Sequence, residues 1–142
     1  IQDNLKAIGI NVEIKTYQWA SYVAFVENPA QEKGMFLMAW NISNDDPDEV
    51  LYPLYHSSQI DAHTNVIFYK NEQFDKLILE ARRMTDKEKR MKIYKEAQDI
   101  IQEDLPHYTL VYPKQNFAFK SNIKGIEVNK RGYFNFQNTI VE

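Results

Sequence analysis

Cysteine is absent from the 142-residue chain. Its absence excludes disulfide scaffolds, thiol catalysis and cysteine-ligated zinc. The sequence also lacks any run approaching the roughly 20 apolar residues that a membrane helix needs. The formal net charge is −3, so there is no general electrostatic attraction to nucleic-acid phosphates. We therefore expect no nucleic-acid partner.

Motifs for chemistry are missing as well. There is no glycine-rich phosphate loop, no GxSxG and no metalloprotease motif. His56, His63 and His107 show no metal-ligand spacing and are expected to be solvated or hydrogen-bonded. We expect no catalytic residue, no cofactor and no metal.

Two chemical alternatives involve one acidic stretch. An enzyme could use Asp45 or Asp46 as acid or base, but catalysis would need a positioned partner that the sequence does not reveal. Asp45, Asp46, Asp48 and Glu49 could bind calcium, but the glycine-containing EF-hand pattern is missing. Complementarity to the N-terminus of a following helix explains these acidic residues more simply.

The remaining composition is that of a soluble globular chain, with 44% hydrophobic and 26% charged residues. Aromatic residues make up 13%, which is enough either to fill a core or to line a pocket. Residues 1–9 have apolar residues at helical spacing and stop at Gly9. This pattern is typical of the end of a helix, so we expect a C-terminal fragment of a longer protein with a truncated N-terminus.

Residues 10–40 predict a βαβ unit. Residues 10–17 alternate apolar and polar side chains, as a half-buried strand does. Residues 19–27 have helical spacing, and a polar turn at 31–34 leads to an apolar strand at 35–40. The order strand, helix, strand makes the two strands parallel. The polar loop 41–47 follows, at the strand end where open α/β sheets place ligands.

Helices dominate the middle of the chain. Pro47 begins a short helix at 48–56, which Pro53 could shorten. A helix from about residue 71 is predicted to bury Phe74, Leu77, Ile78 and Ala81. The next one opens with a capping box from Thr85 to Glu88. Its predicted buried residues are Met91, Tyr94, Ala97, Ile101 and Leu105. We expect this helix pair to pack on the sheet.

Residues 86–90 should be a solvated helix face, or alternatively a surface for docking a permease. Residues 107–112 alternate like a strand, and the short aromatic segments 116–120 and 133–136 flank a turn at 121–125.

Taken in order, these segments resemble the C-terminal portion of extracellular solute-binding proteins of peptide and nickel ABC transporters, the dipeptide- and oligopeptide-binding family. The resemblance covers nearly the whole chain and rests on these motifs: Leu5-x-x-Ile8-Gly9-Ile10-x-Val12, Trp19, Met35 to Trp40 with Asp46-Pro47, Leu51-Tyr52-Pro53-Leu54, Asn71-x-x-Phe74-Asp75-x-Leu77-Ile78-x-Glu80-Ala81, Asp86-x-x-x-Arg90-x-x-x-Tyr94-x-x-x-Gln98-x-Ile100-Ile101 and Asp104-Leu105-Pro106.

The resemblance implies an α/β fold: the C-terminal lobe of a periplasmic binding protein, with a βαβ unit and a helix pair on a mixed sheet. It implies that residues 1–106 form part of this ligand-binding lobe, that 107–115 cross the hinge, and that the β-rich tail 116–142 returns to the other lobe. It also implies a non-enzymatic protein, extracellular or periplasmic and lipoprotein-anchored, that captures oligopeptides and delivers them to an ABC permease.

The resemblance further implies the ligand-binding residues Trp19, Trp40, Asn41, Ser43, Asn44 and Asp45. Both tryptophans could instead be core residues, and the loop residues could instead bond their own backbone. In peptide-binding members the position of Ser43 holds an aspartate that pairs with the ligand's amino group. Serine supplies no charge, so Asp45 could replace that aspartate, or the ligand could be a long peptide, a sugar or a nickel chelate.

Two further expectations concern partners. A sensor or chaperone role on the same fold is an alternative to transport. Tail aromatics exposed by truncation would favour self-association of the chain.

Overall fold

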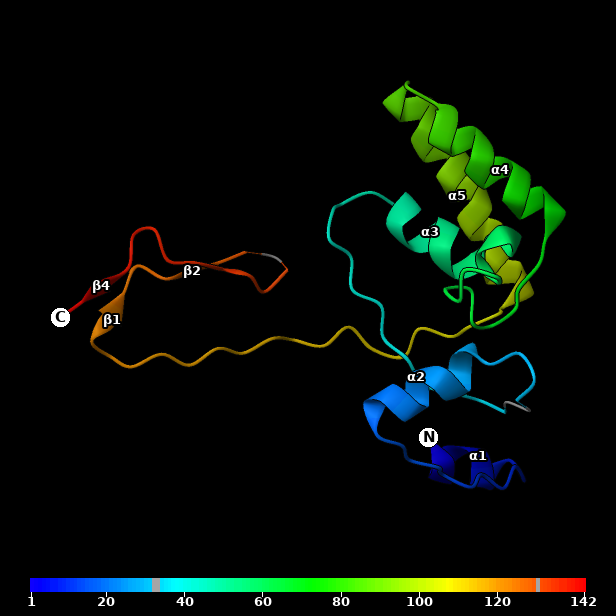
Figure 1. Cartoon of the computed structure of the whole chain (residues 1–142), viewed down its shortest axis with the longest axis horizontal. Helices are drawn as coiled ribbons and strands as arrows, with labels where there is room; N and C mark the ends of the chain where they lie inside the picture. The colour runs from blue at the N-terminus through cyan, green and yellow to red at the C-terminus, as the bar shows by residue number, and fades with distance from the viewer. Residues whose placement is uncertain (32–33, 130) are drawn as a thin grey trace.

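The computed structural model describes residues 1–31, 34–129 and 131–142. Figure 1 shows three parts joined by extended stretches: the short helices α1 and α2, a packed unit of α3, α4 and α5, and a narrow β arm that ends at the C-terminus. The helices are α1 (Gln2–Ala7), α2 (Trp19–Glu27), α3 (Asp48–Tyr55), the 3₁₀ turn η1 (Ser57–Gln59), α4 (Glu72–Arg83) and α5 (Lys87–Asp104). In the described part of the chain, no helix is both long and apolar enough to cross a membrane.

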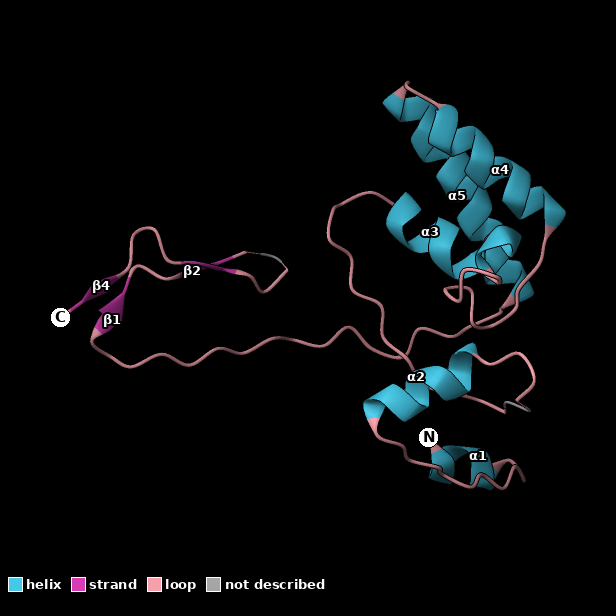
Figure 2. Ribbon diagram, viewed as in Figure 1, coloured by secondary structure: helices cyan, strands magenta, loops and turns pink. Residues whose placement is uncertain are grey.

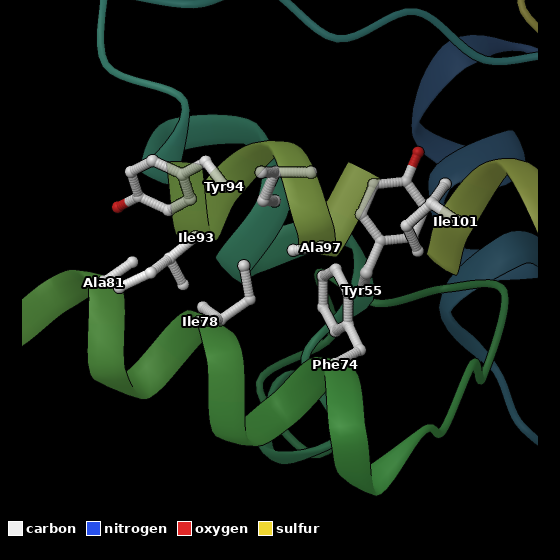
Figure 3. Close-up of a cluster of buried hydrophobic side chains, with 9 residues drawn as sticks. Tyr55, Phe74, Ile78, Ala81, Ile93, Tyr94, Ala97 and Ile101 are labelled. Atoms are coloured by element: carbon white, nitrogen blue, oxygen red, sulfur yellow. The ribbon is translucent and has the colours of Figure 1, made fainter. Parts of the chain in front are cut away.

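The core lies between α3, α4 and α5. Phe74, Ile78 and Ala81 of α4 are fully buried against α5, and Figure 3 shows their side chains pointing towards it. The other members of the cluster are Leu51, Tyr55, Ile93, Tyr94, Ala97 and Ile101. Burying a large apolar side chain contributes about 1.5–3 kcal/mol, so this cluster is the main source of stability in the helical unit.

Side-chain caps set the starts of the two long helices. The side chain of Asn71 accepts hydrogen bonds from the backbone of Gln73 and Phe74, and Asp86 does the same for Glu88 and Lys89. The predicted capping box at Thr85 is therefore wrong, because the carboxylate of Asp86 already satisfies the first free donors of α5. Leu105 ends α5 in the left-handed conformation, with φ 46°.

The buried face of α5 differs from the prediction at three positions. Met91 and Leu105 are 53% and 66% exposed, while Ile93 is buried. Leu77 of α4 is only half-buried. The face turned to α4 is therefore centred on Ile93, Tyr94, Ala97 and Ile101, and the helix ends one residue before Leu105.

The expected βαβ unit is not present among the described residues. Residues 10–17 and 35–40 are extended, but they form no ladder with each other. Side chains occupy backbone groups that a ladder would use: Gln2 donates to the Val12 carbonyl at 2.7 Å, and the Tyr22 hydroxyl bonds both the carbonyl and the amide of Leu37. Ile14 and Leu37 stay 63% and 66% exposed. The described residues therefore offer the helix pair no sheet to pack on, and it packs on α3 instead. The predicted turn at 31–34 lies partly outside the described residues.

The segment from 107 to 120 is extended and forms no ladder within the described chain (Figure 2). The predicted strand 107–112 therefore forms no ladder, and Tyr108 and Tyr112 are 79% and 89% exposed. A strand needs a neighbour to bond its backbone, and no described segment of the chain supplies one here.

The tail forms a small antiparallel arm. β1 (Ile123–Lys124) pairs with β4 (Ile140–Val141), with Ile123 opposite Val141, and β2 (Glu127–Val128) pairs with β3 (Phe134–Asn135), with Val128 opposite Phe134. The prediction at 133–136 contains β3, whereas 116–120 is not a strand and the predicted turn 121–125 contains β1. The division into residues 1–106, 107–115 and 116–142 as lobe, hinge and return segment stays a prediction.

Candidate functional site

The extended segment 35–40 ends at Trp40, whose indole is tied to α3. Its Nε1 donates to the main-chain carbonyl of Glu49 at 3.0 Å. Trp40 remains 44% exposed, and the following Asn41 and Ile42 are exposed as well. The indole is therefore fixed at its nitrogen and still presents apolar surface to solvent.

The carboxylate of Glu49 fixes the loop that follows Trp40. It accepts hydrogen bonds from the Ser43 amide at 2.7 Å, from the Ser43 hydroxyl, and from the Asn44 amide at 2.8 Å. These bonds, the Ser43 hydroxyl first, hold the pKa of Glu49 below its ordinary value. An ionised carboxylate thus lies directly beside Ser43.

The side chains of Asn44 and Asp46 shape the bend that leads from the loop into α3. Asn44 Oδ1 accepts from the Asp46 amide at 2.8 Å, and Asp46 Oδ1 accepts from the Asp48 amide at 2.9 Å. Such turns stabilise a bend locally. The Asn44 side chain therefore bonds the loop backbone, as the alternative from the sequence allowed, whereas the Ser43 hydroxyl bonds the carboxylate of Glu49 in α3. Contact with a ligand stays a prediction for both.

Arg90 of α5 holds the loop against the helical unit. Its guanidinium donates to both carboxylate oxygens of Asp46, at 2.7 and 2.9 Å, and also to the Tyr94 hydroxyl at 2.7 Å and the Ala81 carbonyl at 3.1 Å. The hydrogen bond with Arg90 lowers the pKa of Asp46 and raises that of Arg90. The prediction of a solvated face at 86–90 is therefore wrong for Arg90. The position of Arg90 one turn before the buried Tyr94 was the signal available in the sequence.

The exposed tip of the loop contacts the β arm. Asp45 is 89% exposed at its side chain, and one oxygen lies 3.2 Å from the guanidinium of Arg131, between β2 and β3. The side chain of Asn129 accepts from the Arg131 and Tyr133 amides, which shapes this turn. Sequence reasoning missed Arg131 because nothing local links it to residue 45.

Trp19 lies at the first position of α2, apart from this loop. Its indole is 66% exposed and lies against Tyr22, with ring centroids 6.2 Å apart. Tyr22 in turn bonds the Leu37 backbone, so α2 is attached to the segment that leads to Trp40. Neither tryptophan is a core residue, contrary to the alternative considered from the sequence.

The acidic residues of this region each have partners other than a metal. Asp46 pairs with Arg90, Asp45 with Arg131, and Asp48 lies 3.5 Å from Arg82, while Glu49 caps the loop. The described part of the chain contains no group of three or more side chains suited to hold a metal ion.

The histidines lie outside the loop. His56 is buried and its Nδ1 accepts from the Ser58 amide at 3.1 Å. His107 Nδ1 lies 2.8 Å from the Tyr55 hydroxyl, and partial burial of this ring lowers the pKa of His107. The third, His63, is exposed in a turn with φ 58°. His56 and His107 are thus hydrogen-bonded and His63 is exposed, which agrees with the predicted solvated or hydrogen-bonded role of each histidine.

Comparison with known proteins gives consistent matches. Residues 1–62 match the family described as "Bacterial extracellular solute-binding proteins, family 5 Middle". The chain is 33% identical over 138 residues to the oligopeptide-binding protein AppA of Bacillus subtilis, covering 96% of this chain and 25% of that protein. It is also 33% identical over 135 residues to heme-binding protein A of Haemophilus influenzae, covering 95% and 24%.

A solved structure matches the chain almost throughout. The crystal structure of a dipeptide-binding protein from Pseudoalteromonas sp. SM9913, in complex with Met-Leu, superposes with a TM-score of 0.82 at 27% identity. The match covers 99% of this chain and 27% of that one. The chain spans about a quarter of the length of these relatives. In sequence and in fold the chain is thus similar to a fragment of the bacterial extracellular solute-binding proteins of family 5, whose family model matches residues 1–62.

Proposed function

We propose that this chain is part of a non-enzymatic binding protein that captures short peptides outside the membrane and delivers them to an ABC permease. The proposal is supported by relatives named for oligopeptides and dipeptides and by the match to a protein in complex with Met-Leu. We further propose that the protein is lipoprotein-anchored, and that residues 1–106, 107–115 and 116–142 belong to lobe, hinge and return segment.

One observation carries the proposal: a half-exposed indole and two carboxylates lie within residues 40–49, one carboxylate on the loop and the other on the first turn of α3. Trp40 offers an apolar face, while Glu49 and Asp45 offer negative charge within the same short stretch. A peptide's free amino end combines an ammonium group with apolar side chains, and both features find a complement here. Charge-assisted hydrogen bonds between ammonium and carboxylate are roughly twice as strong as neutral ones.

We assign roles within this site as follows. Trp40 and Trp19 contribute apolar surface, and the polar groups of Asn41, Ser43 and Asn44 orient the peptide. The charge that Ser43 cannot supply comes from a neighbour, either the exposed Asp45 or Glu49, whose carboxylate bonds the Ser43 hydroxyl. Arg131 competes for Asp45, so a ligand's amine would displace that ion pair or use Glu49.

Calorimetry with the full-length protein tests the proposal. Met-Leu and N-acetyl-Met-Leu serve as the pair of probes, because they differ only in the charged amine. We expect Met-Leu to bind and acetylation to reduce affinity at least tenfold, about 1.4 kcal/mol. Asp45→Asn or Glu49→Gln should cause a similar loss, and the exposed control Asp61→Asn should not. Equal binding of both probes would exclude amine recognition, and failure to bind free peptides of any length would exclude the peptide class.

A second candidate is a non-peptide solute. It is favoured by the relative named heme-binding protein A, which matches this chain at the same identity as AppA. Titration with hemin, followed by its absorption spectrum, distinguishes the two. Saturable binding of hemin that free Met-Leu does not displace would favour this candidate.

A further inference from the structure

Helix α3 contains a proline at its sixth residue. Pro53 lies inside the helix Asp48–Tyr55 and has no backbone N–H. In an α-helix the N–H of residue 53 would donate to the carbonyl of residue 49. Because Pro53 cannot donate, the Glu49 carbonyl is left without a partner inside the helix.

The free carbonyl is the one that receives Trp40. The indole Nε1 donates to it at 3.0 Å, so a tryptophan outside the helix supplies the bond that residue 53 cannot make. A hydrogen bond of this kind contributes about 0.5–1.5 kcal/mol net, and it gives the indole nitrogen a defined position beside the helix.

We propose that Pro53 is a positioning residue for the ligand site, because it keeps the Glu49 carbonyl available to Trp40. Glu49 then acts through both its main chain and its side chain. Its carbonyl fixes the indole, and its carboxylate fixes the Ser43 and Asn44 amides. The distance between aromatic face and loop is thereby set by one residue of α3. The consequence for ligand affinity rests on the proposed function, whereas the placement of Trp40 does not.

The substitution Pro53→Ala restores the missing N–H and makes residue 53 a better helix former. The restored N–H competes with the indole for the Glu49 carbonyl. We expect the Trp40 indole N–H signal in a nitrogen–proton correlation spectrum to shift towards the position of a solvent-exposed indole. Its hydrogen exchange should accelerate about five- to tenfold, as expected for the loss of one hydrogen bond. The Trp19 indole is the internal control and should not change.

Further variants separate positioning from general stability. Pro53→Gly also supplies an N–H and should move the Trp40 signal in the same way, although glycine is a poor helix former. Pro29→Ala, at a proline outside every helix, is the matched control. An unchanged Trp40 signal in both Pro53 variants, or an equal change at Trp19, would overturn the proposal.

Affinity for Met-Leu provides the functional readout. We expect Pro53→Ala to weaken binding about five- to tenfold while the thermal midpoint is unchanged or raised, a combination that a merely structural role would not produce. Trp40→Phe retains an aromatic ring without the donor, and adding Pro53→Ala to it should cause no further loss. Additive losses in the double variant would contradict the proposal. If the wild-type protein binds no peptide while the Trp40 signal shifts as expected, the proposed function fails and the positioning stands.

Discussion

Arg90 and Asp46, which are 44 residues apart in sequence, form a bidentate ion pair in which both carboxylate oxygens accept hydrogen bonds from the same guanidinium. The pair joins the loop 41–47 to α5, and Arg90 also donates to the Ala81 carbonyl near the end of α4. Lysine carries the same charge but cannot reproduce this planar geometry.

We therefore predict that Arg90→Lys lowers the free energy of unfolding by about 1–2 kcal/mol, since it removes charge-assisted bonds at a partly exposed site. Amide exchange at Ser43, Asn44 and Asp48 should accelerate more than exchange in α4. Urea denaturation and hydrogen exchange measure the two effects. Arg83→Lys is the control, because Arg83 is an exposed arginine at the end of α4. Equal acceleration throughout the helical unit would show that Arg90 does not hold the loop specifically.

The second prediction concerns the stability of the fold at low pH. The pKa values of Glu49, Asp46 and Asp104 are lowered in the folded chain by side-chain hydrogen bonds from Ser43, Arg90 and Tyr69 respectively. The folded state therefore binds fewer protons than the unfolded state as pH falls below the ordinary values of 3.8 to 4.5.

The stabilisation that Glu49, Asp46 and Asp104 contribute is present above pH 4.5, and it is lost as pH falls through their pKa values in the folded chain. We expect the urea midpoint to decrease slightly as pH falls through 6.5, the ordinary pKa of His107, because the pKa of this ring is lowered in the folded chain, and to decrease further below about pH 4.5. In Glu49→Gln and Asp104→Asn the fall should be shallower. A midpoint whose pH dependence is the same in both variants as in the wild type would contradict the assignment.

The third prediction concerns the β arm. Gly125 has φ +75°, and a Cβ atom there would lie 2.1 Å from the Asn138 carbonyl oxygen. Gly125→Ala should therefore separate β1 from β4, and amide protection at Lys124 and Glu142 should be lost. Gly9 has φ +85° with open space around it, so Gly9→Ala has only the backbone strain of about 1–2 kcal/mol. Equal protection of the arm in both variants would contradict the close approach at Asn138.

The fourth prediction concerns the aromatic side chains of the tail. Phe134 lies edge-to-face with Phe117 and Phe119, at 5.0 and 5.8 Å between centroids, yet it is 41% exposed. Phe136 is 60% exposed beside it. We expect the 142-residue chain alone to self-associate through this surface, and Phe134→Ser with Phe136→Ser to shift sedimentation towards the monomer. Met91→Ser, which removes an exposed apolar residue from α5, should not. A monomer at high concentration in the wild type would rule this out.

Local patterns predicted the helices well. The segments 19–27 and 48–56, and the two helices of the α4–α5 pair, follow from apolar spacing and from breakers within a few residues, and the structure confirms them within one or two residues. Strands were predicted poorly, because alternation at 10–17 and 107–112 indicates an extended backbone without identifying its partner. Tyr22 and Gln2 bond the backbone at Leu37 and Val12 instead.

The site was predicted in outline only. The sequence located the loop after Trp40, and both tryptophans are exposed. It did not reveal that Glu49, assigned to a helix end, bonds Ser43, or that Arg90 and Arg131 reach the loop from distant segments. These contacts depend on how α5 and the β arm approach residues 41–49, and no spacing within the loop encodes that approach.

The loop's shape and its outward surface depend on different residues. Glu49, Asn44 and Asp46 bond the loop backbone, whereas Asn41 and Asp45 face outwards. Under the proposed function, substitutions at positions 41 and 45 would change ligand preference while leaving the loop's path intact. This separation leaves positions 41 and 45 free to vary without disturbing the hydrogen bonds that Glu49, Asn44 and Asp46 make to the loop backbone.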